Sequence, residues 1–219
     1  MNTRILFLEE INRLRHDILS MATRVEEDLG KALNALRTND AELAGEVKAG
    51  DAVVNALQLN IEDKAAMLIA TQQPVARDLR ELVTIFKITG DLERAGDHAV
   101  HLAKAALKMG KGPAFRSIGR LEKMAGIGQE MIRSAVSAYL SQDSDGARAA
   151  AALDDTIDSE HRMLIEEVLE LVKEHPRLVK KAYRLINTSS YMERFGDHIT
   201  NICEGIIYMV EGRHEELNE

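Results

Sequence analysis

The stretch that decides the fold of this chain reads E-R-A-G-D-H at residues 93–98, and it returns as E-R-F-G-D-H at residues 193–198. Five of the six letters are identical, and the two copies lie one hundred residues apart. Each copy sits inside a long run in which apolar residues recur at helical spacing. An internal repeat of this kind predicts two similar halves that fold in the same way.

Few helix breakers interrupt this pattern, and they divide the chain into six expected helices. The sequence G-K-G-P at residues 110–113 is the strongest break, so we predict domains at residues 1–110 and 111–219. Pro74 is expected to open the third helix, because proline suits a first turn. Short connections make neighbouring helices antiparallel, so we predict an all-α fold of two tandem, similar three-helix bundles. The expected helices cover about residues 3–37, 40–71, 74–109, 114–140, 146–174 and 176–210.

The composition excludes several classes of protein. With 45% hydrophobic and 29% charged residues, the chain can bury a core, and aromatics at 4% favour helices over strands. A net charge of −8 disfavours nucleic acid as a partner, since phosphate binding needs a basic surface. No apolar run is long enough for a membrane span or a secretory signal. The single cysteine, Cys203, permits no internal disulfide, so we expect a small core residue and a cytoplasmic location.

The repeated phrase places two carboxylates on one helix face in each half. Glu93 with Asp97, and Glu193 with Asp197, are i,i+4 pairs. Like charges at this spacing repel by a few tenths of a kcal/mol, roughly, unless a cation lies between them. The duplicated pair therefore indicates a bound metal ion.

The helix before each copy offers a matching stripe of oxygen and imidazole donors. Two such stripes facing across antiparallel helices could hold a divalent or trivalent ion. Carboxylate and amide oxygens suit Mg, Mn, Ca or Fe, and added histidine extends the choice to Zn or Ni. The first stripe pair is Asp51, Asn55, Gln58 and Glu62 with Glu93, Asp97 and His101; the second is Asp154, Asp158 and His161 with Glu193, Asp197, Asn201 and Glu204.

Several alternatives stay open at this point. Arg94 and Arg194 could neutralise the carboxylates without a metal, leaving an ordinary solvated surface. Gly96 and Gly196, which are costly inside a helix, indicate either close helix packing or room beside the carboxylates. The histidine that ends each phrase lies about 100° from the aspartate, so capping or packing is its expected role, and support of a metal-binding side chain is the alternative.

Longer stretches resemble the PhoU family: Q-P-V-A-R-D-L-R at residues 73–80, D-L-E-R-A-G-D-H at 91–98, and Y-M-E-R-F-G-D-H-I-T-N-I-C-E at 191–204. The resemblance spans nearly the whole chain. It implies tandem three-helix bundles that bind metal ions and act, without enzymatic activity, as negative regulators of phosphate uptake and of phosphate-responsive two-component signalling. It also implies homodimers and, as partners, the ATPase of the phosphate ABC transporter and a sensor histidine kinase. Contact with the membrane is expected only through these partners.

Carried onto this chain, the metal positions implied by the resemblance fall on eight residues, and the two sets differ. Gln58 and Glu62 depart from the acids typical of the family, and Lys104 stands where the second half has Glu204. We therefore expect two unequal sites, the second being the better one for a cation such as Fe, Mn, Mg or Zn. The carried-over positions are Glu93, Asp97, Asp51 and Asn55 in the first half, and Glu193, Asp197, Asp154 and Asp158 in the second.

Two rival functions deserve comparison. A carboxylate-bridged di-metal oxidase needs two Glu-x-x-His pairs in its core, whereas the one such spacing found joins Glu211 to His214 near the end of the chain. A metal-free helical adaptor is the other rival. No anion cradle is evident, so sensing of phosphate through the transporter is expected. A basic cluster is either a solvated helix start or a surface for an acidic partner or the transporter: Lys173, Arg177, Lys180, Lys181 and Arg184.

Overall fold

The structure is a computed structural model that describes residues 3–109 and 118–218. No strand occurs in these ranges, so the all-α prediction is confirmed. The helices are α1 (Thr3–Thr38), α2 (Ala41–Gln72), α3 (Arg77–Met109), α4 (Ile118–Ser141), α5 (Ser144–Ala151), α6 (Asp154–Glu174), the short 3-10 helix η1 (Pro176–Leu178) and α7 (Val179–Glu211).

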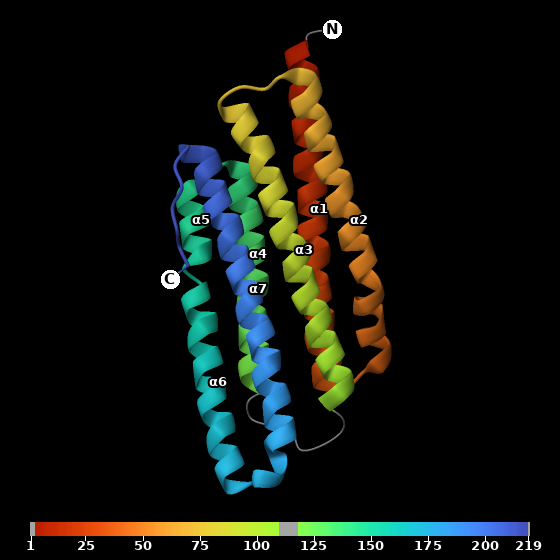
Figure 1. The fold of residues 1–219 in the computed structure, drawn as a ribbon, viewed down its shortest axis with the longest axis vertical. Coiled ribbons are helices and arrows are strands. Elements are labelled where there is room, and N and C mark those ends of the chain that lie inside the picture. The colour runs from red at the N-terminus through yellow and green to blue at the C-terminus, as the bar shows by residue number, and fades with distance from the viewer. Residues whose placement is uncertain (1–2, 110–117, 219) are drawn as a thin grey trace.

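The helices form two similar three-helix bundles, as predicted (Figure 1). In the first bundle α1, α2 and α3 pack against one another. In the second, α4 and α7 pack against each other and against the α5–α6 segment, which takes the place of a single third helix. The predicted domain boundary at residues 110–113 lies outside the described residues.

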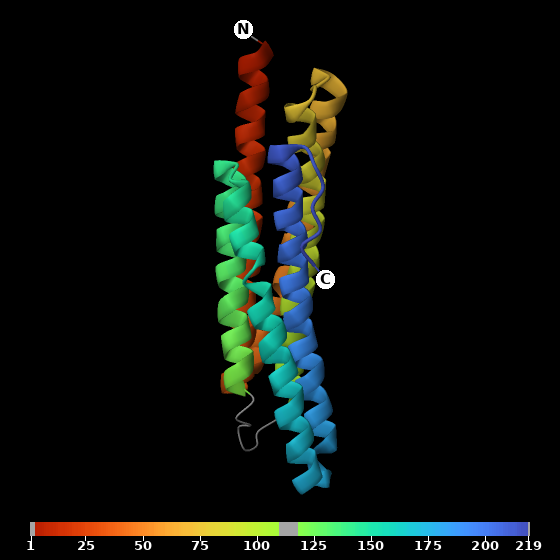
Figure 2. The same cartoon turned by 90° about the vertical axis from the view of Figure 1, so that its left-hand side faces the viewer.

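The bundles meet along α3 and α7, with a second contact between α1 and α4. The helices α3 and α7 run antiparallel: the Thr84 hydroxyl donates to the Gly205 carbonyl at 3.4 Å near one end, and Arg184 donates to the Lys108 carbonyl near the other. As a result the bundles are offset lengthwise. The turn between α2 and α3 projects beyond the second bundle at one end, and the turn between α6 and α7 projects beyond the first at the other (Figures 1 and 2).

The same turn chemistry begins the second helix of each half. Asn39 and Gln142 adopt left-handed backbone with φ of 56° and 55°, and each precedes an aspartate. The Asp40 carboxylate accepts from two backbone amides of α2, and Asp143 does the same for α5. These N-caps satisfy amides that a helix start leaves without partners.

The third predicted helix begins three residues later than expected. Gln73 and Ala76 have φ of 47° and 46°, which interrupts helical geometry on both sides of Pro74. The helix α3 therefore begins at Arg77, and the prediction that Pro74 opens it is wrong. In the second half Pro176 does open a helical segment, the 3-10 helix η1.

The fifth predicted helix is interrupted at Ala152 and Leu153. The Leu153 amide bonds to the Ala150 carbonyl at 3.3 Å, three residues back, so the regular four-residue bonding stops there. A new helix, α6, begins at Asp154. The break places Asp154 and Asp155 in a first helical turn, where the helix dipole favours negative charge.

The core runs along both bundles and their contact. Cys203 is fully buried in it, which confirms the prediction of a small core residue. Within the described ranges, no helix has both the length and the apolar composition that crossing a bilayer requires.

Candidate functional site

The two copies of the repeated phrase occupy equivalent environments on α3 and α7. Residues 91–100 and 191–200 follow the same sequence of buried, half-buried and exposed positions. The glutamate and the second acid of each copy are half-buried, whereas the arginine is exposed. The duplication in sequence is therefore a duplication of local structure.

The first acidic stripe brings together Asp51 of α2 and the acids of α3. Burial and the neighbouring charge of Asp97 raise the pKa of Asp51, and the same two causes raise the pKa of Glu93. Lys104 and His101 act in the opposite direction on Asp51. Negative charge is thus concentrated between the two helices at this point, and Lys104 offsets part of it.

The remaining donors of α2 divide into two groups. Asn55 is half-buried, and its Oδ1 has no hydrogen-bond partner among the described residues. Gln58 instead donates to Glu62 at 3.0 Å, and the Thr89 hydroxyl donates to the same Glu62 oxygen at 3.2 Å. The sequence placed all three on one donor stripe, but in the structure Gln58 and Glu62 bond to each other, whereas Asn55 keeps a buried oxygen without a partner.

The second acidic stripe centres on Asp154, which is 9% exposed. The Thr200 hydroxyl donates to its Oδ2 at 3.1 Å, while Oδ1 has no partner among the described residues. Burial raises the pKa of Asp154 to about 7, and the charges of Asp197, Asp158 and Glu193 add to the rise. The four acids predicted for this half therefore lie within electrostatic reach of one another.

Solvent reaches this stripe through a hollow of about 650 Å³. Burial, followed by charge repulsion within the stripe, also raises the pKa of Glu193 and of Asp197. A cation in the hollow would meet the carboxylates of Asp154, Asp158 and Asp197, which line it. The residues that line it include Arg148, Asp154, Asp155, Asp158, Arg162, Asp197 and Asn218.

The two repeated glycines have different neighbours, which resolves the alternatives drawn from the sequence. A Cβ on Gly96 would lie 3.4 Å from Val54 and 3.6 Å from Val25, an ordinary packing distance. A Cβ on Gly196 would lie 2.0 Å from Asp154 Oδ1, so only glycine leaves space for that carboxylate. Close packing describes the first glycine, and room for an acid describes the second.

Two predicted donors of the second half have other partners. His161 Nδ1 lies 2.8 Å from the hydroxyl of Ser189. Asn201 donates from Nδ2 to Asp91 of α3 at 3.4 Å. Both therefore bond to groups outside the acidic stripe.

Glu204 is also engaged elsewhere, which corrects one reason for preferring the second site. Its carboxylate lies 3.2 Å from Lys87 Nζ and accepts from the Leu217 amide at 3.0 Å. The difference between the halves instead comes from Lys104, which lies near the first stripe, and from the buried Asp154 in the second.

The histidines that end the two phrases pack together between the bundles, as expected of packed residues. The rings of His98 and His198 stack with centroids 5.4 Å apart. His198 Nδ1 lies 3.0 Å from Asp91 Oδ1, and His98 stacks on Tyr191 at 6.0 Å. Burial lowers the pKa of His98 to about 4, with further lowering from His198. The sequence did not indicate these roles for Asp91 and Tyr191. Each lies two helical turns before the histidine of its own phrase but contacts the histidine of the other phrase.

The donor chemistry of the stripes fits a metal ion, although the ligands are not preassembled. Across residues 3–109 and 118–218, no three His, Cys, Asp or Glu side chains gather closely enough to hold one. The unpartnered oxygens of Asn55 and Asp154 are nevertheless what a cation would satisfy. Neither Arg94 nor Arg194 forms an ion pair within those ranges, so arginine does not neutralise the acids there by direct contact.

Comparison with known proteins accounts for the repeat. Residues 18–106 and 121–206 each match the PhoU domain. The chain belongs to the PhoU family. It is 33% identical to a "Phosphate-specific transport system accessory protein PhoU homolog" of Clostridium acetobutylicum, over 99% of this chain and 100% of the relative. A relative of the same description in Aquifex aeolicus is 34% identical over 96% of this chain and 97% of its own.

Solved PhoU structures share the fold. The crystal structure of PhoU from Pseudomonas aeruginosa superposes with a TM-score of 0.89 at 33% identity, covering 94% of this chain and 100% of that one. The phosphate transport system regulatory protein PhoU from Streptococcus pneumoniae has the same TM-score at 30% identity, covering 96% and 99%. The resemblance noted in the sequence motifs is therefore confirmed over both bundles.

Proposed function

We propose that this protein is a negative regulator of phosphate uptake and of phosphate-responsive two-component signalling. The observation that carries the proposal is end-to-end similarity: both bundles match the PhoU domain, and relatives named as accessory proteins of phosphate-specific transport align with nearly the whole chain. The protein would act by binding other proteins and not by catalysing a reaction.

The rival reading as a di-metal oxidase has little support from the one Glu-x-x-His pair. Glu211 is ion-paired with Arg148 at 2.8 Å and with Arg213 at 2.7 Å. His214 stacks on Tyr208 with ring centroids 4.2 Å apart, after the end of α7. Glu211 and His214 are thus each engaged with other neighbours near the end of α7, whereas an oxidase needs both aimed into its core.

The expected partners are the ATPase of the phosphate transporter and a phosphate-sensing histidine kinase, met in the cytoplasm by a homodimer. The names of the relatives support a link to the transport system, since they describe accessory proteins. The elongated pair of bundles offers long lateral faces on which such partners could dock (Figure 2).

Divalent or trivalent cations, with Fe, Mn, Mg or Zn as the candidates, are proposed to bind the two acidic stripes. A bound ion would supply positive charge between carboxylates that otherwise repel. Burial and mutual repulsion raise the pKa of several of these carboxyl groups, so their charged forms are destabilised and a cation beside them would be favourable. The residues that would hold the ions are Asp51, Asn55, Glu93 and Asp97 in the first half, and Asp154, Asp158, Glu193 and Asp197 in the second.

A reporter assay tests the regulatory role. The gene is placed in a bacterium that lacks its own PhoU homologue and carries a reporter behind a phosphate-responsive promoter. The wild-type protein should restore repression when phosphate is plentiful, and failure of a folded, well-expressed protein to do so would refute the proposed function.

The role of the stripes is tested in the same strain. Replacing Glu93, Asp97, Glu193 and Asp197 by their amides should relieve repression and lower the metal content of protein purified without chelator. The matched control changes Arg94 and Arg194 to Gln beside the same stripes, and it should leave repression intact. Full repression by the amide variant would refute the metal-dependent part alone.

A further inference from the structure

The start of the last helical segment, at one end of the second bundle, is basic in a chain whose net charge is −8, whereas the end of the neighbouring α6 carries Glu170, which is ion-paired with Lys173, and Glu174. Residues 177–184 contain four basic residues and no acidic one. The corresponding residues of the first half, 77–84, contain two basic and two acidic residues and are neutral. Equivalent positions in the repeat thus carry different charge. We name the four residues the basic tip: Arg177, Lys180, Lys181 and Arg184.

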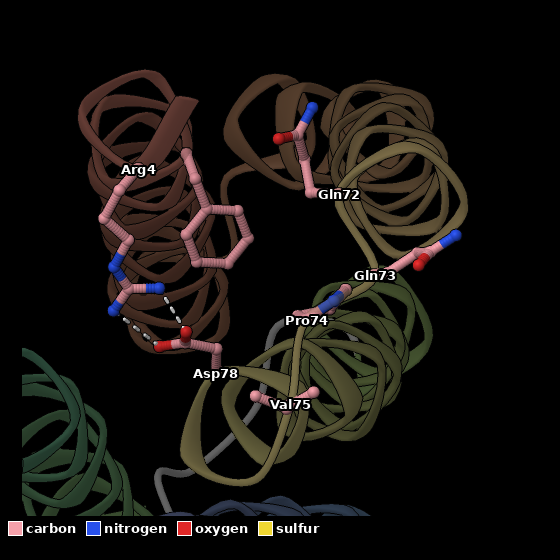
Figure 3. Close-up of a pocket in the computed structure, with 7 residues that line it drawn as sticks. Arg4, Gln72, Gln73, Pro74, Val75 and Asp78 are labelled. Carbon is pink, nitrogen blue, oxygen red and sulfur yellow. Dashed lines mark hydrogen bonds and ion pairs between the residues drawn. The ribbon is translucent and has the colours of Figure 1, made fainter. Parts of the chain in front are cut away.

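The equivalent segment of the first bundle, residues 77–84, shows how the difference in charge arises. There Asp78 of α3 is ion-paired with Arg4 of α1, beside the turn that leads into α3 (Figure 3). Glu81 is buried and ion-paired with α1 at 2.7 Å. In the second half Leu178 and Lys181 stand at the positions of these two acids. The positive charge of the basic tip therefore comes from these two replacements and from Arg184, which stands at the position of Thr84.

Two of its side chains are well placed to meet a charged surface. Arg177 and Lys180 are exposed, and neither forms an ion pair within the part of the chain that the structure describes. Their charges are available to an external anion without first breaking an internal contact.

Large apolar side chains are exposed beside these cations. Tyr183 is 66% exposed, Val179 54% and Leu169, on the neighbouring α6, 52%. Val179 and Tyr183 are one helical turn apart, so they share a face of α7, and Lys180 follows about 100° around the helix. Tyrosine with aliphatic and basic neighbours is typical of segments that lie at a membrane interface.

The basic tip also lies apart from the acidic stripes. The turn that carries it projects beyond the end of α3 (Figures 1 and 2). Lys180 and Glu193 are thirteen residues apart on α7, which is about 20 Å along the helix. The Debye length at physiological salt is about 8 Å, so the acids of the stripes are screened from a surface that touches the tip.

We propose that the basic tip binds the surface of an anionic lipid bilayer. The projecting shape, the cations and the exposed Tyr183 suit a flat anionic surface with an apolar layer beneath it. The protein would then contact the membrane directly as well as through protein partners, which departs from the expectation, drawn from the sequence, of contact through partners only.

Co-sedimentation of the full-length protein with vesicles tests the proposal. Vesicles contain phosphatidylcholine alone or with about one quarter phosphatidylglycerol. The wild-type protein should bind only the anionic vesicles, and binding should weaken as salt rises toward about 1 M. R177E/K180E should weaken it by about 30-fold or more, since each cation close to an anionic membrane contributes roughly fivefold. Tyr183→Ser should reduce the binding that persists at high salt.

The matched control is R13E/R77E, which makes the same change in charge with two exposed arginines of the first bundle. It should bind anionic vesicles about as well as the wild type, and circular dichroism should show both double variants folded. Equal loss in the two double variants would refute a role for the basic tip. Wild-type binding to immobilised poly-glutamate without binding to anionic vesicles would also overturn the proposal and assign the tip to an acidic protein surface. The vesicles contain no transporter, so the result is independent of the proposed regulatory function.

Discussion

The substitution Asp154→Asn tests whether burial, together with the neighbouring carboxylates, makes the ionised form of Asp154 destabilising. The carboxyl of Asp154 ionises near 3.8 in an unfolded chain and near 7 in the folded protein. Between these values the folded protein keeps the proton that the unfolded chain has lost, so the free energy of unfolding falls as pH rises from about 4 to 7. The full difference corresponds to about 4 kcal/mol, and screening by solvent in the adjoining hollow reduces the expected loss to about 2 kcal/mol.

Asparagine keeps the shape of the side chain but cannot ionise, so the variant escapes this loss. At about pH 8, with a chelator present, we expect Asp154→Asn to be more stable than the wild type by about 2 kcal/mol, or about 4 to 8 °C in melting temperature. At about pH 4 the two proteins should unfold together. Urea and thermal unfolding followed by far-ultraviolet circular dichroism measure both differences.

The exposed neighbour provides the control, because Asp155→Asn makes the same change in net charge on the solvent side of the same helical turn. It should alter stability by less than about 0.5 kcal/mol at either pH. Equal gains from both variants would show that overall charge, and not the buried position of Asp154, is responsible. A variant at Asp154 that is less stable than the wild type at about pH 8 would contradict the reasoning itself.

The other predictions concern packing. Gly96→Ala should be tolerated or should stabilise the protein by up to about 1 kcal/mol, because Val54 is at packing distance and alanine favours helix. Gly196→Ala should lower the melting temperature, because the new Cβ would lie 2.0 Å from Asp154. Equal effects of the two substitutions on the melting temperature would disprove the different roles of these glycines. Burial raises the pKa of the Cys203 thiol to about 12, so a thiol reagent should label it only after unfolding, and rapid labelling of the native protein would contradict its placement in the core.

Much of the fold could be predicted from the sequence because the repeat and the turn signals are local. Asp40, which caps α2, favours a helix start through bonds to nearby backbone amides and so does not depend on tertiary contacts. The break after Ala151 could not be found in this way, since alanine and leucine are strong helix formers. It coincides with a tertiary contact, Asp154 against Gly196, in which one residue lies on each of two helices.

The candidate site shows the same division between local and tertiary information. Helical periodicity correctly placed the acids of α3 and α7 on one face, because that depends on a single helix. The facing residues depend on the register between helices, which periodicity does not determine. Gly96 and Gly196 are equivalent in the repeat, but the structure places Val54 against the first and Asp154 against the second. The two sets of donors therefore differ by more than their sequences suggested.

The contact between α3 and α7 has a consequence for how this protein can diverge. The contact of His98 with Tyr191 and the contact of His198 with Asp91 join equivalent positions of the two repeats. The repeats therefore meet as two subunits of a dimer meet across a twofold axis. In a dimer of separate identical chains every substitution would arise on both sides of that axis at once. Covalent fusion removes this constraint, so one half can gain a buried acid or a basic end while the other keeps its original character.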